Sequence, residues 1–394
     1  MTVEVAMKPE ILSQLRKYVV PEMVFGTGAR FLTGRYLDNF NIRNTMIVTD
    51  PGVREAGWLD DVIRILNEQK TRYIIFDQVT PNPRDHEVMK GAEIYLENKC
   101  NGIIAVGGGS PLDAAKGIGI VANNGGHILD YEGVDEIPSV IPPLICIPTT
   151  SGSSADVSQF AIINNTNKKK KIAIISKALV PDISLIDPET TTTMDAELTA
   201  ATGLDALTHA IEALVSNARS PLTDLNALEA IRLVFVHLIN AIHNPKDLEA
   251  RKGMSLASLL AGMAFSNASL GAVHAMAHAL GGLLDLPHGK CNAILLPHVI
   301  TSNYDSCPDQ YNKIGEITGI TQKEMSDSEK KGIIIQQIKN LTHQAGITDT
   351  LSDLHVSQEA MNALTDNALK DACIYTNPKD LSFEELRGIY ESAK

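Results

Sequence analysis

The sequence lacks the features that mark secreted, nucleic-acid-binding and membrane proteins. Its five cysteines are odd in number and form no CxxC pair, so the cysteine pattern indicates neither a disulfide framework nor a thiolate zinc site. The net charge of −13 argues against a nucleic-acid or anionic-membrane surface, since both need a basic face. The start, MTVEVAMKPEILSQL, has no basic segment followed by an apolar run, and no stretch reaches the ~20 apolar residues of a membrane span. We therefore expect a cytoplasmic protein with no nucleic-acid or membrane partner.

The first half of the chain alternates short apolar runs with helical stretches. Uninterrupted Ile/Val runs that end in Gly, Ser, Asp or Pro are typical of strands covered on both faces of a mostly parallel sheet. These runs lie at 45–50, 73–77, 102–110, 143–150, 160–163, 171–176 and 183–187. We expect a doubly wound α/β dinucleotide-binding domain with a mostly parallel sheet over residues 1–190.

The strand pattern stops after about residue 187. Amphipathic helices are then predicted at 195–216, 221–243, 247–267 and 270–284, around 293–305, and at several places up to Lys394. We therefore expect an all-α C-terminal domain over residues 191–394. The short Lys168–Lys171 run is interpreted as a solvated turn between two strands.

A glycine loop follows one of the predicted strands. In IIAVGGGSPLDAAK, Ser110 is expected to cap a helix that has Pro111 at its first position. This order leaves free N–H groups at the positive end of a helix, which suits a phosphate. The loop lacks both GxGxxG spacing and a Walker lysine, so a phosphate-binding loop and a simple tight turn both stay open. Asp50 ends another predicted strand, where it either accepts hydrogen bonds from the ribose of NAD or serves as a turn residue.

Histidines gather in one apolar stretch, GAVHAMAHALGGLLDLPHG (271–289). Buried imidazoles need partners, so they are either satisfied locally or converge on a ligand. Asp205 and His209 are one helical turn apart and could bind one ion, although they could also belong to the wet face of their helix. The Asp-Leu-Pro-His-Gly break lets His288 turn back toward His274, so that three histidines and one aspartate would form a metal site. His298 has no such partner, and we interpret it as structural.

These segments resemble the iron-containing, or type III, alcohol dehydrogenases over essentially the whole chain. The similarity is carried by PNP (81–83), GGGSPLDAAK (107–116), PTTSGSSADVSQF (148–160), ATGLDALTHAIEA (201–213), AGMAFSNASLGAVHAMAHALGG (261–282), PHGKCNAILLPH (287–298) and DACIYTNPK (371–379). The resemblance implies a dehydroquinate synthase-like architecture and metal-dependent, NAD(H)-linked interconversion of aldehydes with short-chain primary alcohols, or diols such as 1,3-propanediol. A glycerol or polyol dehydrogenase of the same superfamily is the alternative.

The resemblance also implies roles for individual residues. The metal ligands would be Asp205, His209, His274 and His288, with His278 beside the nicotinamide in a catalytic or proton-relay role. The cofactor-contacting positions would be Asp50, Asn82, Gly108, Gly109, Ser110, Thr149, Thr150 and Lys171. The substrate pocket would be lined by Phe160, Phe265 and Cys373.

The implied cofactors are NAD and Fe²⁺, with Zn²⁺, Co²⁺ or Mn²⁺ able to use the same ligands. The implied partners are a small alcohol or aldehyde and further copies of the chain, in a homodimer or larger assembly. One segment departs from the family pattern. The residues after the threonines read SGSSAD (151–156), where the family usually has AGTGSE.

Overall fold

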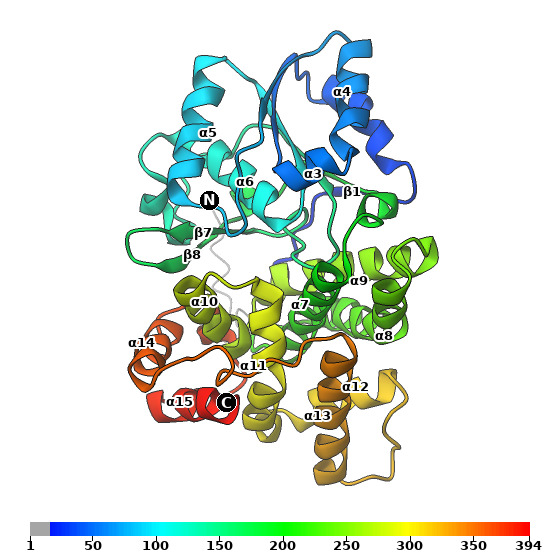
Figure 1. Ribbon diagram of the computed structural model, residues 1–394, viewed down its shortest axis with the longest axis vertical. Coiled ribbons are helices and arrows are strands. Elements are labelled where there is room, and N and C mark those ends of the chain that lie inside the picture. The colour runs from blue at the N-terminus through cyan, green and yellow to red at the C-terminus, as the bar shows by residue number, and fades with distance from the viewer. Residues whose placement is uncertain (1–15) are drawn as a thin grey trace, which may run out of the picture.

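The computed structural model describes residues 16–394 and places a parallel sheet above a helical bundle (Figure 1). The sheet has six strands in the order β1-β9-β6-β4-β2-β3. The strands are β1 (Glu22–Phe25), β2 (Asn44–Val48), β3 (Arg72–Phe76), β4 (Gly102–Gly107), β6 (Leu144–Pro148) and β9 (Ile183–Ile186), and all their pairings are parallel. Every residue of β4 and β6 is buried, because helices cover both faces of a sheet of this kind.

Alternate residues of each strand feed two separate apolar cores. Ile47 and Ile104 face the helices on one side, α2 (Thr33–Asn39) and α4 (Trp58–Glu68). Met46 and Ala105 face those on the other, α5 (Asp85–Glu97) and α6 (Gly109–Asn124). The short helix α3 (Pro51–Glu55) follows β2. The doubly wound sheet predicted from the apolar runs is thereby confirmed.

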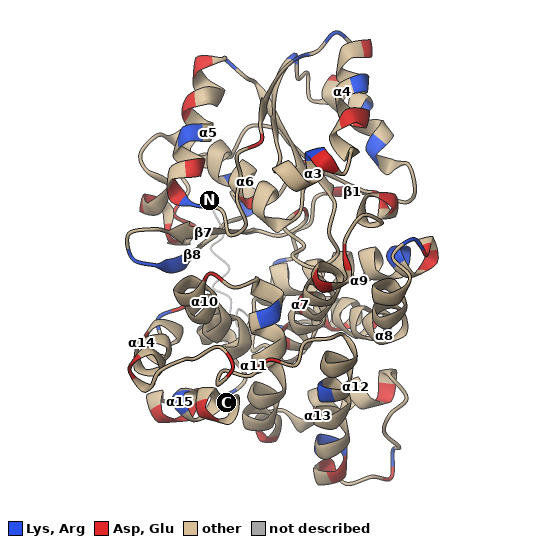
Figure 2. Cartoon of the chain, viewed as in Figure 1, with Lys and Arg blue, Asp and Glu red and all other residues tan. Residues whose placement is uncertain are grey.

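Two of the predicted strands lie outside this sheet. β7 (Phe160–Asn165) and β8 (Lys170–Ile175) pair antiparallel and form a separate three-stranded sheet with β5 (Gly133–Val134). Placing 160–163 and 171–176 in the mostly parallel sheet was wrong, because a four-residue connection allows a hairpin but not the crossover that parallel neighbours need. Figure 2 shows the Lys168–Lys171 run in blue at the tip of this hairpin.

The rest of the chain is helical. Its helices are α7 (Ala196–Val215), α8 (Pro221–His243), α9 (Leu248–Ala268), α10 (Ala272–Leu284), α11 (His288–Asn303), α12 (Pro308–Ile317), α13 (Asp327–Gln344), α14 (Gln358–Ala368) and α15 (Phe383–Ser392). They share one apolar core, in which α7, α8 and α9 pack together and α11 crosses α7. The last strand ends at Ile186 and α7 begins at Ala196, on either side of the predicted boundary at residue 190.

One helix within residues 16–394, α8, is long and apolar enough to cross a membrane by length and composition. It contains Asp224, Glu229 and Arg232, and it packs against α7 and α9 in the bundle. A core helix of a bundle can have the same length and composition, so the absence of a membrane partner stays a prediction.

Candidate metal centre and cofactor crevice

The predicted cofactor residues of the α/β half lie at the carboxyl edge of the sheet. Asp50 follows β2, Gly108 and Gly109 follow β4, and Thr149 and Thr150 follow β6. The chain runs from β2 outward to β3 and then returns to β4 on the other side of β2. The order of the strands therefore reverses between β2 and β4, and the crevice at such a point is where α/β sheets bind nucleotides.

The glycine loop presents backbone rather than side chains to this crevice. α6 begins at Gly109, and its N-cap is Gly108, which supplies no side-chain cap. The expectations of a Ser110 cap and of Pro111 at the first helical position were wrong, because the helix starts two residues earlier than predicted. Instead, the Asn82 N–H donates to Ser110 Oγ at 3.2 Å. Without a capping side chain, the first N–H groups of α6 stay available for an anion.

These glycines also permit a close approach of the next loop. A Cβ built on Gly108 would lie 2.9 Å from the Thr150 side chain, and one on Gly109 would lie 2.8 Å from Ser153 Cβ. Contacts under about 3 Å force one partner to move. The glycine loop (107–109) and the segment after β6 (149–153), which we call the threonine segment, therefore form one narrow wall.

Asp50 has a local structural role in the fold. It is the N-cap of α3, and its carboxylate accepts a hydrogen bond from the Val53 N–H at 2.9 Å. Burial raises the pKa of Asp50, while the backbone donors lower it. The local geometry of Asp50 is therefore that of a turn residue, one of the two roles considered from the sequence. A contact between Asp50 and the ribose of NAD stays a prediction.

Asn82 and Lys171 connect the two halves of the protein. Asn82 Nδ2 donates to Asp285 Oδ1 at 2.9 Å, just after α10, and Arg84 forms an ion pair with the other oxygen of Asp285 at 3.1 Å. Lys171 lies against Gly281 of α10, and burial lowers its pKa while acidic groups, Asp205 among them, raise it. The lysine run is therefore more than a solvated turn, because its last residue lies between the hairpin and the helical half.

Four side chains from three helices converge in the helical half. Asp205 Oδ1 lies 3.9 Å from His209 Nε2 and 3.8 Å from the Nε2 atoms of His274 and His288. One potential ligand atom from each of the four lies within 4.8 Å of all the others. Asp205 and His209 are each only 4% exposed, so the alternative that placed them on a wet helix face was wrong.

Close packing of α11 on α7 brings His288 into this group. A Cβ on Gly289 would collide with the Ala201 carbonyl oxygen of α7, so only glycine allows this approach. α10 ends at Leu284, its C-cap Asp285 is in the left-handed conformation at φ 52°, and the chain turns back there. His288 is the first residue of α11, a helix that begins five residues earlier than expected. The break after Leu284 thus makes the convergence possible, as the sequence predicted.

Outer contacts orient two of the histidines. His274 Nδ1 lies 2.6 Å from Glu212 Oε2, and the other oxygen of Glu212 accepts the Val273 N–H at the start of α10. His209 Nδ1 lies 3.1 Å from the carbonyl oxygen of Gly152. With the Nδ1 proton held outward, each Nε2 presents its lone pair to the centre. Burial raises the pKa of Glu212 to about 7, against the opposing effect of its N–H donors.

The donor set fits a divalent metal ion. Burial lowers the pKa of His274 and His288 well below the usual value, so both rings are neutral near pH 7 and can act as ligands. Three imidazole nitrogens and one carboxylate oxygen suit Fe²⁺, Zn²⁺ and similar ions. His288 presents Nε2 to Asp205 Oδ1, while its Nδ1 is buried without a hydrogen-bond partner in the part of the chain described.

His278, one turn after His274, has a different environment. Its Nδ1 lies 2.8 Å from Asp371 Oδ2, and Asp371 Oδ1 accepts the Cys373 N–H at 2.8 Å. Burial alone would raise the pKa of Asp371, but the charge and hydrogen bond of His278 and the donors at Cys373 lower it below the usual value. The ring of His278 stacks on that of His288 at 5.2 Å, so it borders the candidate metal centre without sharing its donor cluster.

The predicted pocket residues also lie around the centre. Phe265 stacks on His209 with ring centroids 4.2 Å apart, and Phe160 meets Phe265 edge-on at 5.5 Å. Cys373 is fully buried beside the His278–Asp371 pair. These side chains give the centre apolar walls on the side of the hairpin and α9.

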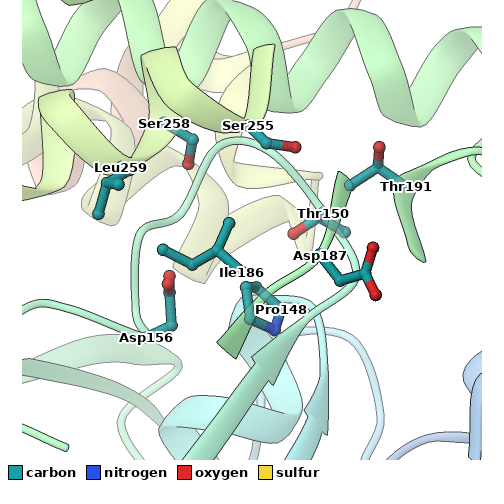
Figure 3. A pocket seen from close by; sticks show the side chains of 9 residues that line it. All are labelled: Pro148, Thr150, Asp156, Ile186, Asp187, Thr191, Ser255, Ser258 and Leu259. Atoms are coloured by element: carbon teal, nitrogen blue, oxygen red, sulfur yellow. The ribbon is translucent and has the colours of Figure 1, made fainter. Parts of the chain in front are cut away.

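The segment that departs from the family pattern fastens the two halves together. Ser154 Oγ donates to the Ser258 carbonyl of α9 at 2.7 Å, and Asp156 accepts from Ser184 Oγ at 2.6 Å. A cavity of about 10 Å³, with room for about one water molecule, lies beside this segment. Figure 3 shows Asp156 and Thr150 among the side chains that line it. The cavity is lined by Pro148, Thr150, Asp156, Ile186, Asp187, Thr191, Ser255, Ser258 and Leu259. Ser154 therefore links the two halves, whereas Asp156 is bonded to β9 within the α/β half and only lines the cavity at their boundary.

Sequence reasoning did not identify three polar residues at the centre. Glu212 was not singled out, yet it is 4% exposed and contacts His274. Asn292 lies one turn after His288, and that i,i+4 spacing was the available signal. Asp371 opens the DACIYTNPK segment, where only its cysteine was singled out.

Comparison with known proteins agrees with this geometry. The protein-family model described as "Iron-containing alcohol dehydrogenase" matches residues 21–188. A second family model, "Fe-containing alcohol dehydrogenase family, C-terminal", matches residues 199–394. The chain is 43% identical to alcohol dehydrogenase 4 of Schizosaccharomyces pombe, covering 95% of this chain and 88% of that one. It is 39% identical to the 1,3-propanediol dehydrogenase of Citrobacter freundii, with coverages of 95% and 98%. A crystal structure of a 1,3-propanediol oxidoreductase superposes with a TM-score of 0.93 at 39% identity, covering 96% of this chain and all of that one.

Proposed function

Since the chain belongs to the iron-containing alcohol dehydrogenase family, we propose that it is an Fe²⁺- and NAD(H)-dependent enzyme acting on short-chain primary alcohols, or on diols such as 1,3-propanediol. Interconversion of alcohols and aldehydes by this chain follows from the family itself. Similar chains include an NAD-dependent methanol dehydrogenase and a lactaldehyde reductase, which supports NAD and small substrates. The glycerol or polyol alternative is not favoured by these relatives.

The observation that carries the proposal is the Asp205–His209–His274–His288 cluster, which is largely buried and contacts the crevice loop through Gly152. These four residues would hold the metal ion. A divalent ion there supplies Lewis-acid chemistry, which lowers the pKa of a substrate hydroxyl. Three neutral imidazoles and one carboxylate would leave net positive charge on a divalent ion held at this place.

The protein's own groups supply the rest of the reaction. The N–H groups at the start of α6 would bind the pyrophosphate of NAD, and Asp50 would accept from the ribose and repel the extra phosphate of NADP. Phe160 and Phe265 exclude water from the reacting carbon. His278 holds or moves a proton at Nε2, since its Nδ1 is engaged by Asp371. When bound, NAD(H) would supply the hydride chemistry at the carbinol carbon.

The test is metal analysis of protein purified without oxygen, together with NADH formation from ethanol, 1-propanol, 1-butanol, 1,2-propanediol, 1,3-propanediol and glycerol, before and after chelation. We expect about one iron ion per protein chain and chelator-sensitive oxidation of primary alcohols. NADP should be a poor substitute for NAD. Protein that binds NAD but holds no metal and oxidises none of these alcohols would contradict the proposal. Cytoplasmic location and assembly into a homodimer or larger oligomer complete the proposal, to be tested by fractionation and by light scattering.

A further inference from the structure

Asn292 lies among the atoms of the candidate metal centre, although neither the spacing of the histidines nor the family resemblance singled it out. It is fully buried on α11, one turn after His288. Its Nδ2 lies 2.7 Å from Asp205 Oδ1, 3.2 Å from His274 Nε2 and 3.3 Å from His288 Nε2. One amide group therefore reaches three of the four potential ligand atoms.

The contact with Asp205 is the strongest of the three. The acceptor is a carboxylate, and the distance is the shortest, as expected for a hydrogen bond to a charged group. Asp205 Oδ1 is also the oxygen that lies 3.8–3.9 Å from the three histidine nitrogens. The amide of Asn292 thus donates to the one oxygen that faces the centre.

The orientation of the Asn292 amide leaves one of its polar atoms without a partner among the described residues. Its Oδ1 is buried and has no hydrogen-bond partner in the part of the chain described. Rotating the amide would turn this oxygen toward the Asp205 carboxylate and the histidine lone pairs, where acceptor would meet acceptor. Asn292 Oδ1 therefore stays unpaired on the side away from the four ligands, because the side that faces Asp205 and the histidines requires a donor.

We propose that Asn292 is a positioning residue of the metal centre: its amide fixes the carboxylate of Asp205 so that Oδ1 faces the three histidine nitrogens, and this sets the affinity of the site for a divalent ion. A neutral donor suits this task, because a lysine or arginine in its place would repel the ion. This inference rests on the proposed function, since it requires that the four ligands bind metal.

The experiment measures Co²⁺ affinity by competition with a chelator, together with the visible absorption spectrum of the bound ion. The variants are Asn292→Ala, Asn292→Ser and the control Asn303→Ala. Asn303 is also a buried asparagine on α11, but its amide pairs with Asn377 and not with a ligand. We expect Asn292→Ala to bind Co²⁺ about 10- to 100-fold more weakly, the usual loss for an outer-shell partner of a metal ligand.

Asn292→Ser keeps a small donor and should lose less affinity, and it is the variant to use if Asn292→Ala does not fold. Asn303→Ala should lower the unfolding temperature while its Co²⁺ affinity stays within about twofold of wild type. The Co²⁺ spectrum of the Asn292 variants should shift without the change in intensity that accompanies loss of a ligand.

Three results would overturn the inference in distinguishable ways. Wild-type affinity and spectrum in both Asn292 variants would reduce Asn292 to a packing residue. A spectrum showing one ligand fewer would make Asn292 a direct ligand through Oδ1 and not a positioning group. Failure of the wild-type protein to bind Co²⁺ at all would remove the metal centre, and the proposed function with it.

Discussion

The cofactor crevice and the metal centre are built in opposite ways. At the crevice, Gly108 and Gly109 contribute only backbone, and the helix start they form carries no side-chain cap. At the metal centre, every contribution is a side chain projecting from the interior of a helix bundle, as with His209 and His274. The glycine loop therefore depends on the absence of side-chain atoms, whereas the metal centre depends on the identity of a few of them.

The two regions meet at shared loops. The carbonyl of Gly152, which belongs to the threonine segment of the crevice, lies 3.1 Å from His209 Nδ1. Asn82 and Arg84 contact Asp285, at the end of the helix that carries His274. Variants can therefore test whether the two regions act independently.

Loss of a metal ligand should have the largest effect. Asp205→Ala or His288→Ala removes one of four converging donors, so metal and activity should be lost together, the latter by roughly 10³-fold or more. NAD binding should persist, because the crevice lies in the other half. Metal content, NADH formation and NAD binding are measured side by side. His298→Ala is the control, since His298 lies on α11 but pairs with Ser392. Full turnover in either ligand variant would refute the ligand assignment.

The next effect separates proton handling from metal binding. His278→Ala should keep the metal and lose about 10²-fold in kcat, the usual contribution of a general acid or base. Asp371→Ala should lose less, because the ring stays but its Nδ1 partner is gone. Metal content should match wild type in both. Retained rate in His278→Ala, or loss of metal in Asp371→Ala, would place these residues outside the proposed role.

The sequence predicted some features of the backbone and of the side chains and missed others. The apolar strand runs predicted the doubly wound sheet, and the resemblance supplied the four residues that the structure brings together. The hairpin of β7 and β8 was missed, because apolar runs do not reveal strand direction. The N-cap was misplaced by two residues, since consecutive glycines leave the start of a helix undefined in sequence. Glu212 was missed because α7 is buried on nearly all sides, which an amphipathic pattern does not predict.

The smallest effect is expected where a single methyl group enters the crevice. Gly109→Ala places a Cβ 2.8 Å from that of Ser153, so the glycine loop and the threonine segment must separate slightly. NAD binding should weaken about tenfold, the equivalent of one or two distorted hydrogen bonds. Gly332→Ala on α13 is the matched control, because a Cβ there meets nothing within 4 Å. Titration of NADH fluorescence gives the affinity, and metal analysis accompanies it. Unchanged metal content in Gly109→Ala would show that the crevice can be damaged alone. A parallel loss of metal would instead mean that the contact between Gly152 and His209 transmits the strain, and the two regions would then be one site.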